Sequence, residues 1–501
     1  MPAKHIYWIL VVAVLSLFSV WCADPYAGTF RYVVRKIRSH AIRPLSEREL
    51  FDASISGLIA SVDENSSYIQ PKTYGDLNEE FHQESGSTGI LFYQEPISRK
   101  ICVGATLPRS SARLAGVLPG DELLAMDGVS FEKLSFEEVC AQLNSPTGVE
   151  VSLDVFRPSS QKKLTFPLTS RKLPIESVTG VARSANGSWN YFLPPLPSPL
   201  QSNDSAKAAA GTNAQAAPRV NPKSVSEQTP PAPTAAGKAG SPKIVYARLE
   251  TFGERTVEEM RQILKSGRQA QADGLILDLR GNGGGLLESA LGVCGLFLPT
   301  NVPVVRIMGP NDSKAEPLCS PEKQVWEKPI VILMDGETAS ASEILAVCLQ
   351  DYGEQGLIRA ICVGSRTYGK GTIQDIFDMG PIPDDRRLAS EEDPKTLWQK
   401  IWTRPMRGGF RISVAEYLSP SLKRIHRFPN ASDADEWGVR PNPGWEVPWS
   451  SNPLWQKDRK KFQTEWWNFN DLRRCGALPQ NRWEEIYGFD LPLRQAVRFF
   501  Y

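Results

Sequence analysis

The chain has 501 residues, more than one ordinary hydrophobic core accommodates, so two or three domains are predicted. Its formal net charge is +1, which excludes a global field that would attract nucleic acid. The eight cysteines show neither a CxxC motif nor paired zinc spacing. We therefore expect no metal, no cofactor and no disulfide framework, although a single bridge stays open.

Residues 1–23 have the pattern of an export signal. Lys4 and His5 precede an almost wholly apolar run from Ile6 to Trp21. That run is shorter than the roughly 20 residues that span a bilayer. We predict a signal peptide or an uncleaved N-terminal anchor, because Trp21 is a poor neighbour for a cleavage site. The bulk of the chain is then exported, periplasmic or otherwise extracytoplasmic, with association to an inner membrane left open.

Two different regions follow the signal. Residues 24–84 are predicted to be helical, since large apolar residues recur every three to four positions between Leu50 and Ile59, before turn formers at 63–68. Residues 85–172 are predicted to form a compact β-rich module. Apolar runs recur there at 89–93, 101–105, 122–126, 149–156 and 164–168, with short helical patterns at 111–115 and 136–143.

Residues 183–242 are dominated by Pro, Ala, Ser, Gly, Gln and Asn. Such a composition buries too little apolar surface to offset its ordering entropy, so we predict a disordered linker or insertion. Residues 243–447 alternate buried strands with helices, which favours an α/β core. Residues 448–501 form an extension rich in Trp and Arg, which we expect to pack onto that core.

Ser340 is the first candidate catalytic residue. It follows a buried strand at 329–334 and begins a helix, whose unpaired N–H groups and partial positive charge favour an oxyanion. Ser340 and Glu343 also match the Ser-x-x-Glu capping box, so a purely structural cap is the alternative. Asp351 lies 11 residues further along the helix, roughly 16 Å away at about 1.5 Å per residue, and cannot touch Ser340.

Lys370 is the candidate base, framed by Gly369 and Gly371. A lysine that acts as a base must be neutral, and desolvation lowers its pKa. With only four histidines in the chain, a lysine base is more attractive than a histidine. The alternative is an ordinary surface lysine in a loop.

Residues 281–285 (Gly-Asn-Gly-Gly-Gly) lie between a strand and a helix and can present backbone N–H groups to an anion. A phosphate loop is less favoured, because neither a Gly-x-x-x-x-Gly-Lys motif nor a full dinucleotide fingerprint is present.

Together these segments resemble the carboxyl-terminal processing proteases, the tail-specific serine peptidases of family S41A. The resemblance rests on Thr338–Ile344, Gln350-Asp351, Gly369–Gln374 and Leu277–Gly285. It implies a Ser340 nucleophile, a Lys370 base and a supporting Gln374, with the N–H groups of Gly284 and Ala341 as the oxyanion hole. It also implies a crotonase-like (ClpP/crotonase-type) α/β serine protease core over residues 243–447. An acyl-CoA enzyme of that fold is disfavoured by the export signal.

Residues 110–129 (SSARLAGVLPGDELLAMDGV) resemble the centre of a PDZ domain, which implies a PDZ domain over 85–172. Such domains bind a peptide C-terminus as an added strand. The peptide-binding loop falls on Thr88, Gly89, Ile90 and Leu91, and polar Thr88 departs from the family pattern. Ser340 and Lys370 are 30 residues apart, about five more than the family spacing implies, so residues 354–358 must loop away.

We therefore expect an exported serine endopeptidase that acts on proteins or peptides with accessible C-termini. The alternatives are a catalytically inactive PDZ scaffold of the same fold, or Ser342 as the nucleophile. Sequence leaves the oligomeric state open.

Overall fold

The computed structural model describes residues 25–43, 45–70, 84–95, 98–143, 148–184, 186–197, 241–309, 312, 314–382, 406–478 and 482–501. The predicted signal or anchor and most of the predicted linker, 198–240, lie outside the described residues. Within the described part, no helix is long and apolar enough to cross a membrane. The chain divides into one unit of Met1–Gly75 with Gln374–Ser413, and a second of Asp76–Ile373 with Val414–Tyr501.

The first unit contains helices, as predicted, but also strands. Its elements are α2 (Pro25–His40), α3 (Glu47–Ala60), β1 (Ser67–Ile69) and most of the long strands β19 (Thr372–Ile382) and β20 (Met406–Leu418). After α3 ends at Ala60, the Asp63 carboxylate accepts the backbone N–H groups of Asn65 and Ser66 and forms a turn. The turn leads into β1, which pairs antiparallel with β20, so the region 24–84, predicted to be helical with a break at 63–68, also contains a strand.

The second unit includes a β-rich module over residues 84–174. Its elements are β2 (Glu84–Ser87), β3 (Ile90–Gln94), β4 (Ile101–Thr106), α5 (Ser111–Ala115), β5 (Glu122–Met126), β6 (Val129–Ser130), η1 (Phe131–Lys133), α6 (Phe136–Leu143), β7 (Glu150–Arg157), β8 (Lys162–Thr169) and β9 (Arg171–Pro174). The main sheet runs β3-β4-β5-β7-β8. Strands and helices lie where the apolar runs predicted them, while the identity of the module as a PDZ domain stays a prediction.

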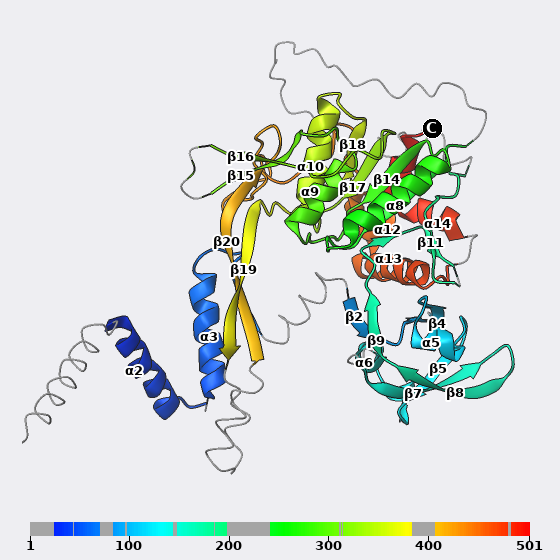
Figure 1. Cartoon of the computed structure of the whole chain (residues 1–501), viewed down its shortest axis with the longest axis horizontal. Coiled ribbons are helices and arrows are strands. Elements are labelled where there is room, and N and C mark those ends of the chain that lie inside the picture. Colours follow the sequence, from blue (N-terminus) through cyan, green and yellow to red (C-terminus); the bar gives the residue numbers. More distant parts are fainter. Residues whose placement is uncertain are drawn as a thin grey trace, which may run out of the picture. The chain divides into compact units, whose positions relative to one another are not determined.

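A five-stranded sheet lies at the centre of the second unit (Figure 1), in the order β10-β13-β14-β17-β18. Its strands are β10 (Val178–Thr179), β13 (Ile244–Leu249), β14 (Gly274–Asp278), β17 (Ile330–Met334) and β18 (Ala360–Gly364). The last four are mutually parallel, and β10 is antiparallel to β13. Parallel strands need helices on both faces, and this explains why the strands read as continuous apolar runs.

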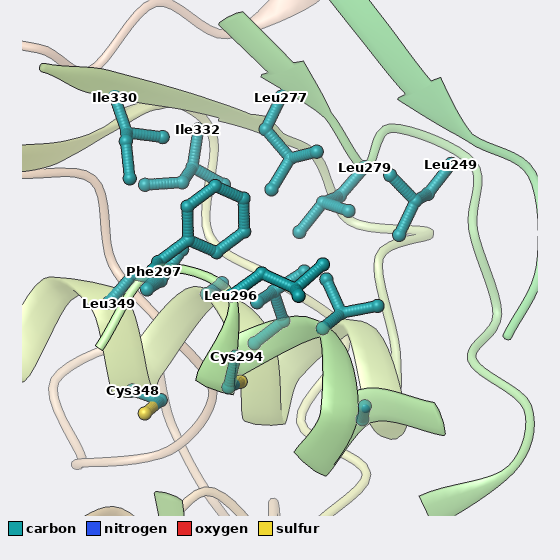
Figure 2. Close-up of a cluster of buried hydrophobic side chains, with 14 of the residues drawn as sticks. Leu249, Leu277, Leu279, Cys294, Leu296, Phe297, Ile330, Ile332, Cys348 and Leu349 are labelled. Atoms are coloured by element: carbon teal, nitrogen blue, oxygen red, sulfur yellow. The ribbon is translucent and has the colours of Figure 1, made fainter. Parts of the chain in front are cut away.

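One face of this sheet is covered by α8 (Thr256–Gln269), α9 (Leu287–Gly295) and α10 (Ala341–Glu354). Figure 2 shows side chains of β14 and β17 pointing toward Leu296 and Phe297, with Cys294 on α9 and Leu349 on α10 nearby. Every labelled side chain of this cluster is fully buried or nearly so. Burying apolar area of this kind supplies the main favourable term in folding.

The opposite face is covered by the C-terminal extension, as expected. Its elements are η4 (Trp449–Ser451), α12 (Pro453–Lys457), α13 (Arg459–Arg474), α14 (Trp483–Phe489) and α15 (Leu491–Arg498). Alternate residues of the strands, such as Ile276 and Val331, pack there against Ile486 and Tyr487.

The remaining strands of this unit are β11 (Ala182–Arg183), β12 (Trp189–Asn190), β15 (Pro303–Met308) and β16 (Glu316–Cys319). The end of β20 pairs with β15 beside the central sheet. The predicted α/β class is confirmed, whereas the crotonase-type assignment of the core stays a prediction.

Candidate active site

Ser340 lies at the turn between β17 and α10 in a strained backbone conformation. Its φ is 58° and its ψ is −120°, a region that side-chain-bearing residues rarely adopt. Such strain costs on the order of 1–3 kcal/mol and clusters at functional sites. The residue is half-buried, so its side chain is accessible at the start of the helix. A cap alone does not require this conformation.

The two flanking hydroxyls are used inside the protein. Thr338 is fully buried, and its Oγ1 donates to the Leu279 carbonyl at 2.9 Å. Ser342 is also fully buried, and its Oγ donates to the Asn282 carbonyl at 3.1 Å. Both side chains therefore form hydrogen bonds from the serine loop, residues 335–340, and the start of α10 to the segment 279–285 that contains the glycine loop, residues 281–285. Of the three hydroxyls, the accessible one is Ser340, which weakens the alternative of a Ser342 nucleophile.

Glu343 forms hydrogen bonds to both the serine loop and the lysine loop, residues 365–371. Its buried carboxylate accepts the Ser340 N–H at 3.0 Å and the Lys370 N–H at 2.8 Å, both on Oε2. The two backbone nitrogens therefore lie no farther apart than 5.8 Å, the sum of these distances. The other oxygen, Oε1, accepts the Gly369 N–H at 2.8 Å and the Thr367 hydroxyl at 2.5 Å.

The same carboxyl group has an unusual proton affinity. Burial raises the pKa of Glu343 to about 7, although the hydrogen bonds from Thr367 and from backbone N–H groups act in the opposite direction. Near neutral pH the group thus lies close to its titration midpoint. Its ionised form can accept all four donors, whereas a protonated oxygen gives up part of that capacity.

Tyr417, near the end of β20, makes a second connection. Its hydroxyl lies within hydrogen-bonding reach of the Ser340 carbonyl, at 3.0 Å, and of the Lys370 carbonyl. Its backbone N–H donates to the Gly371 carbonyl at 2.9 Å. Lys370 itself is half-buried. The two predicted catalytic residues thus come from loops that are fixed to each other, despite the 30 residues between them.

The extra residues before Lys370 lie away from these contacts. Helix α10 runs to Glu354, and residues 355–359 form the turn into β18. Asp351, near the end of α10, accepts the Ser421 N–H at 2.9 Å and pairs with Lys423 at 3.0 Å. These contacts agree with the structural role that its distance from Ser340 predicted.

The glycine loop approaches the serine closely. A side chain at Gly284 would meet the Ser340 Cβ at 2.8 Å and the Ala341 N at 3.0 Å, and its φ is 108°. Both facts require glycine. The Gly284 N–H, predicted to line the oxyanion hole, donates here to Asn282 Oδ1 at 2.8 Å. The Ala341 N–H is the first amide of α10, where a helix offers no acceptor of its own.

Gln374 belongs to the first unit, and its Nε2 donates to the Asn65 carbonyl within that unit. Its support of Lys370 stays a prediction.

The predicted peptide-binding residues lie at the start of β3, an outermost strand of its sheet. Thr88 is buried, and its carbonyl accepts the Ala112 N–H at 3.2 Å. Gly89 has a φ of 80°, and its N–H donates to Ser87 Oγ at 3.0 Å. Ile90 and Leu91 pair with β4, opposite Thr106 and Ala105. The loop is thus held by its own module, and in the adjacent β3 the Phe92 carbonyl accepts the Cys475 Sγ–H of the C-terminal extension at 3.1 Å.

Comparison with known proteins decides the class. Residues 243–435 match the model of peptidase family S41. A carboxyl-terminal-processing protease of Synechocystis sp. (strain ATCC 27184 / PCC 6803 / Kazusa) is 28% identical over 386 residues, which cover 77% of this chain and 70% of that protein. The chain is a serine-type peptidase, and its residues 243–435 resemble peptidase family S41.

Two further proteins are similar to this chain. The carboxy-terminal processing protease CtpB of Bacillus subtilis (strain 168) is 22% identical over 346 residues, which cover 69% of the peptidase and 59% of CtpB. The solved structure of a photosystem II D1 C-terminal processing protease covers 83% of the peptidase and 86% of its own chain, at 21% identity and a TM-score of 0.35.

Sequence reasoning found the two loops but missed what joins them. Glu343 was visible only as a capping partner of Ser340, and its contacts with Thr367, Gly369 and Lys370 span more than 20 residues. Tyr417 lies in β20, and nothing in its local sequence indicated a contact with Ser340 or Lys370. In both cases the local pattern held no signal for the distant partner.

Proposed function

We propose that the peptidase cleaves protein substrates near their C-termini with a dyad of Ser340 and Lys370. The supporting observation is the arrangement around Glu343. One buried carboxylate holds the strained, accessible Ser340 beside the loop that carries Lys370. Strain maintained by surrounding contacts is characteristic of preorganised catalytic groups.

In this mechanism, neutral Lys370 removes the proton from Ser340 Oγ as that oxygen attacks the scissile carbonyl carbon. The tetrahedral intermediate collapses, the C–N bond breaks, and the leaving amine takes the proton from the Lys370 ammonium. Water then gives a proton to Lys370 and attacks the acyl-enzyme. Release of the acid product returns Ser340 and Lys370 to their starting forms.

The oxyanion is stabilised by the Ala341 N–H and, in the transition state, by the Gly284 N–H. The Gly284 N–H must first leave Asn282 Oδ1, its present acceptor. Loss of one such donor typically costs a factor of about 10²–10³ in kcat. Gln374 is proposed to orient Lys370.

Substrate tails are proposed to bind to the β-rich module, acting as a PDZ domain. An incoming C-terminal strand would add to the outer edge of β3, with its carboxylate near Thr88–Leu91, and would have to accommodate the contact between Cys475 Sγ and the Phe92 carbonyl. The outermost position of β3 supports this proposal. The apolar run at residues 6–21 supports export of the peptidase.

Labelling with a fluorophosphonate tests the nucleophile. We expect stoichiometric labelling at Ser340 in the wild type, none in Ser340→Ala, and labelling that still maps to Ser340 in Ser342→Ala, the matched variant two residues away. Lys370→Met should slow labelling by a factor of about 10²–10⁴, the usual contribution of a general base. Labelling mapped to Ser342, or equal turnover by wild type and Ser340→Ala, would contradict the assignment.

A second experiment tests capture of substrate tails. One unstructured peptide substrate is prepared with a free C-terminal carboxylate and with a C-terminal amide. We expect kcat/KM to fall at least tenfold for the amide, because the carboxylate-binding loop loses its charged ligand. Equal rates for both peptides would remove the proposed role of Thr88–Leu91.

The inactive scaffold is disfavoured, since Ser340, Lys370 and Gln374 are all present.

A further inference from the structure

Arg280 is a fully enclosed cation at the base of the glycine loop. It lies two residues beyond the end of β14 and is 2% exposed. Its Nε and Nη2 donate to the two oxygens of Asp278 at 2.9 and 2.7 Å. A buried guanidinium needs most of its donors satisfied, and one carboxylate occupies only one side of the planar fork.

The other side of the fork is occupied by the C-terminal extension. Asp490 accepts Arg280 Nη1 at 2.8 Å and Nη2 at 2.9 Å, although 210 residues separate the two in sequence. Asp490 is 5% exposed, so this ion pair is shielded from solvent. The Trp449 ring of the same extension lies 4.8 Å from the Arg280 guanidinium. The extension therefore supplies one of the two carboxylates that bind this guanidinium, and an aromatic ring beside it.

Short connections lead from Arg280 to the reacting groups. The next residue, Gly281, donates its N–H to Asp335 Oδ1 at 3.1 Å. Asn282 then accepts the Gly284 N–H on its side chain, and its carbonyl accepts the Ala339 N–H at 3.0 Å. These hydrogen bonds connect the backbone next to Arg280 with the loop that faces Ser340.

We propose that Asp490 of the extension is a positioning residue for catalysis, which holds Arg280 and, through it, the glycine loop against Ser340. The inference rests on the proposed function of Ser340. It assigns a part in the active site to a segment that lies beyond the matched family region, residues 243–435. Asp490 touches no reacting atom and acts through Arg280 alone.

Asp490 has a second role that the test must separate. Its Oδ1 accepts the Leu493 N–H at 2.9 Å and caps α15. Asparagine caps a helix about as well as aspartate, so Asp490→Asn keeps the cap and removes the charge. Asp458 offers a matched control, because it caps α13 in the same extension and is exposed.

The experiment compares wild type, Asp490→Asn and Asp458→Asn in the full chain. Two quantities are measured with a fluorophosphonate: the rate of Ser340 labelling and the final labelled fraction, which counts folded sites. For Asp490→Asn we expect at least a tenfold lower rate with an unchanged final fraction. With a peptide substrate, kcat should fall by a similar factor while KM stays within twofold. Asp458→Asn should match the wild type within twofold.

A purely structural role would lower the final labelled fraction and leave the rate per folded site unchanged, and that result would overturn the inference. If Asp490→Asn yields no folded protein, Asp490→Glu keeps the charge but displaces the carboxylate by one methylene. Its rate should then fall at least threefold, and an unchanged rate would overturn the inference. Wild type that is not labelled at Ser340 overturns the proposed function as well as the inference.

Discussion

The two faces of the central sheet are both buried, but by different kinds of contact. On the α8–α10 face, aliphatic and aromatic side chains fill the space between strands and helices. On the face covered by the extension, apolar residues surround charged groups, among them Arg280, Asp490 and Arg473. Apolar packing is non-directional, whereas a buried ion pair depends on geometry. The first face therefore mainly supplies stability, and the second also constrains the glycine loop.

The largest effect is expected from Arg280→Met. This change leaves Asp278 and Asp490 buried without their shared cation. Removing one partner of a buried ion pair typically costs about 3–5 kcal/mol. We expect a loss of this size in the free energy of unfolding, measured with urea, together with loss of turnover. A change below about 1 kcal/mol would mean that Arg280 contributes no more than a surface charge.

The apolar face should respond differently to Leu349→Ala. Leu349 is fully buried in α10 beside Phe297 (Figure 2). Leucine-to-alanine changes in cores cost about 2–5 kcal/mol. We expect a loss in that range, measured by urea unfolding, while the labelling rate per folded site stays within twofold of the wild type. A tenfold slower rate would show that this face also positions the site.

A pH-dependent difference is expected from Glu343→Gln. The folded-state pKa of Glu343, about 7, lies above its ordinary value of 4.5, so folding favours the protonated group. The stabilising contribution is full below about pH 4.5 and is lost as the pH rises through 7. At about 1.4 kcal/mol per pKa unit, the contribution of Glu343 to the free energy of unfolding changes by about 3 kcal/mol between low and high pH.

Urea unfolding of wild type and Glu343→Gln at pH 4.5 and pH 8 measures this term. The unfolding free energy of the wild type minus that of the variant should be larger at pH 4.5 than at pH 8. The variant should also turn over at least tenfold more slowly at pH 8, since an amide nitrogen would face backbone N–H donors. A stability difference that does not depend on pH would contradict the raised pKa.

The smallest effect is expected from Arg473→Met. Arg473 Nη1 donates to the Tyr246 hydroxyl at 3.0 Å, but among the described residues its Nε and Nη2 have no hydrogen-bond partner. Replacing a poorly compensated buried charge with an apolar side chain is often neutral or stabilising. We expect a change in unfolding free energy within about 1 kcal/mol. A loss as large as that of Arg280→Met would erase the distinction between the two arginines.

Sequence reasoning located most elements of the second unit, because strand and helix periods are local properties. It placed Ser340 at the start of α10 and a glycine loop after β14, as the structure has them. A turn built by Asp63 leads the chain into β1. The sequence predicted a break in the helix there. It did not predict β1, because the strand that pairs with β1 lies about 340 residues away in the sequence.

The sequence by itself determined the class of the protein, through hydroxyl, lysine and glycine segments whose residues are close together along the chain. Only the tertiary structure decided how these segments meet. It joined the Ser340 and Lys370 loops through Glu343, occupied the Gly284 N–H with Asn282, and brought Asp490 to Arg280. The physical reason is that a buried charge must be paired, and its partner is determined by which residues the tertiary packing places beside it. The local sequence pattern does not contain that information.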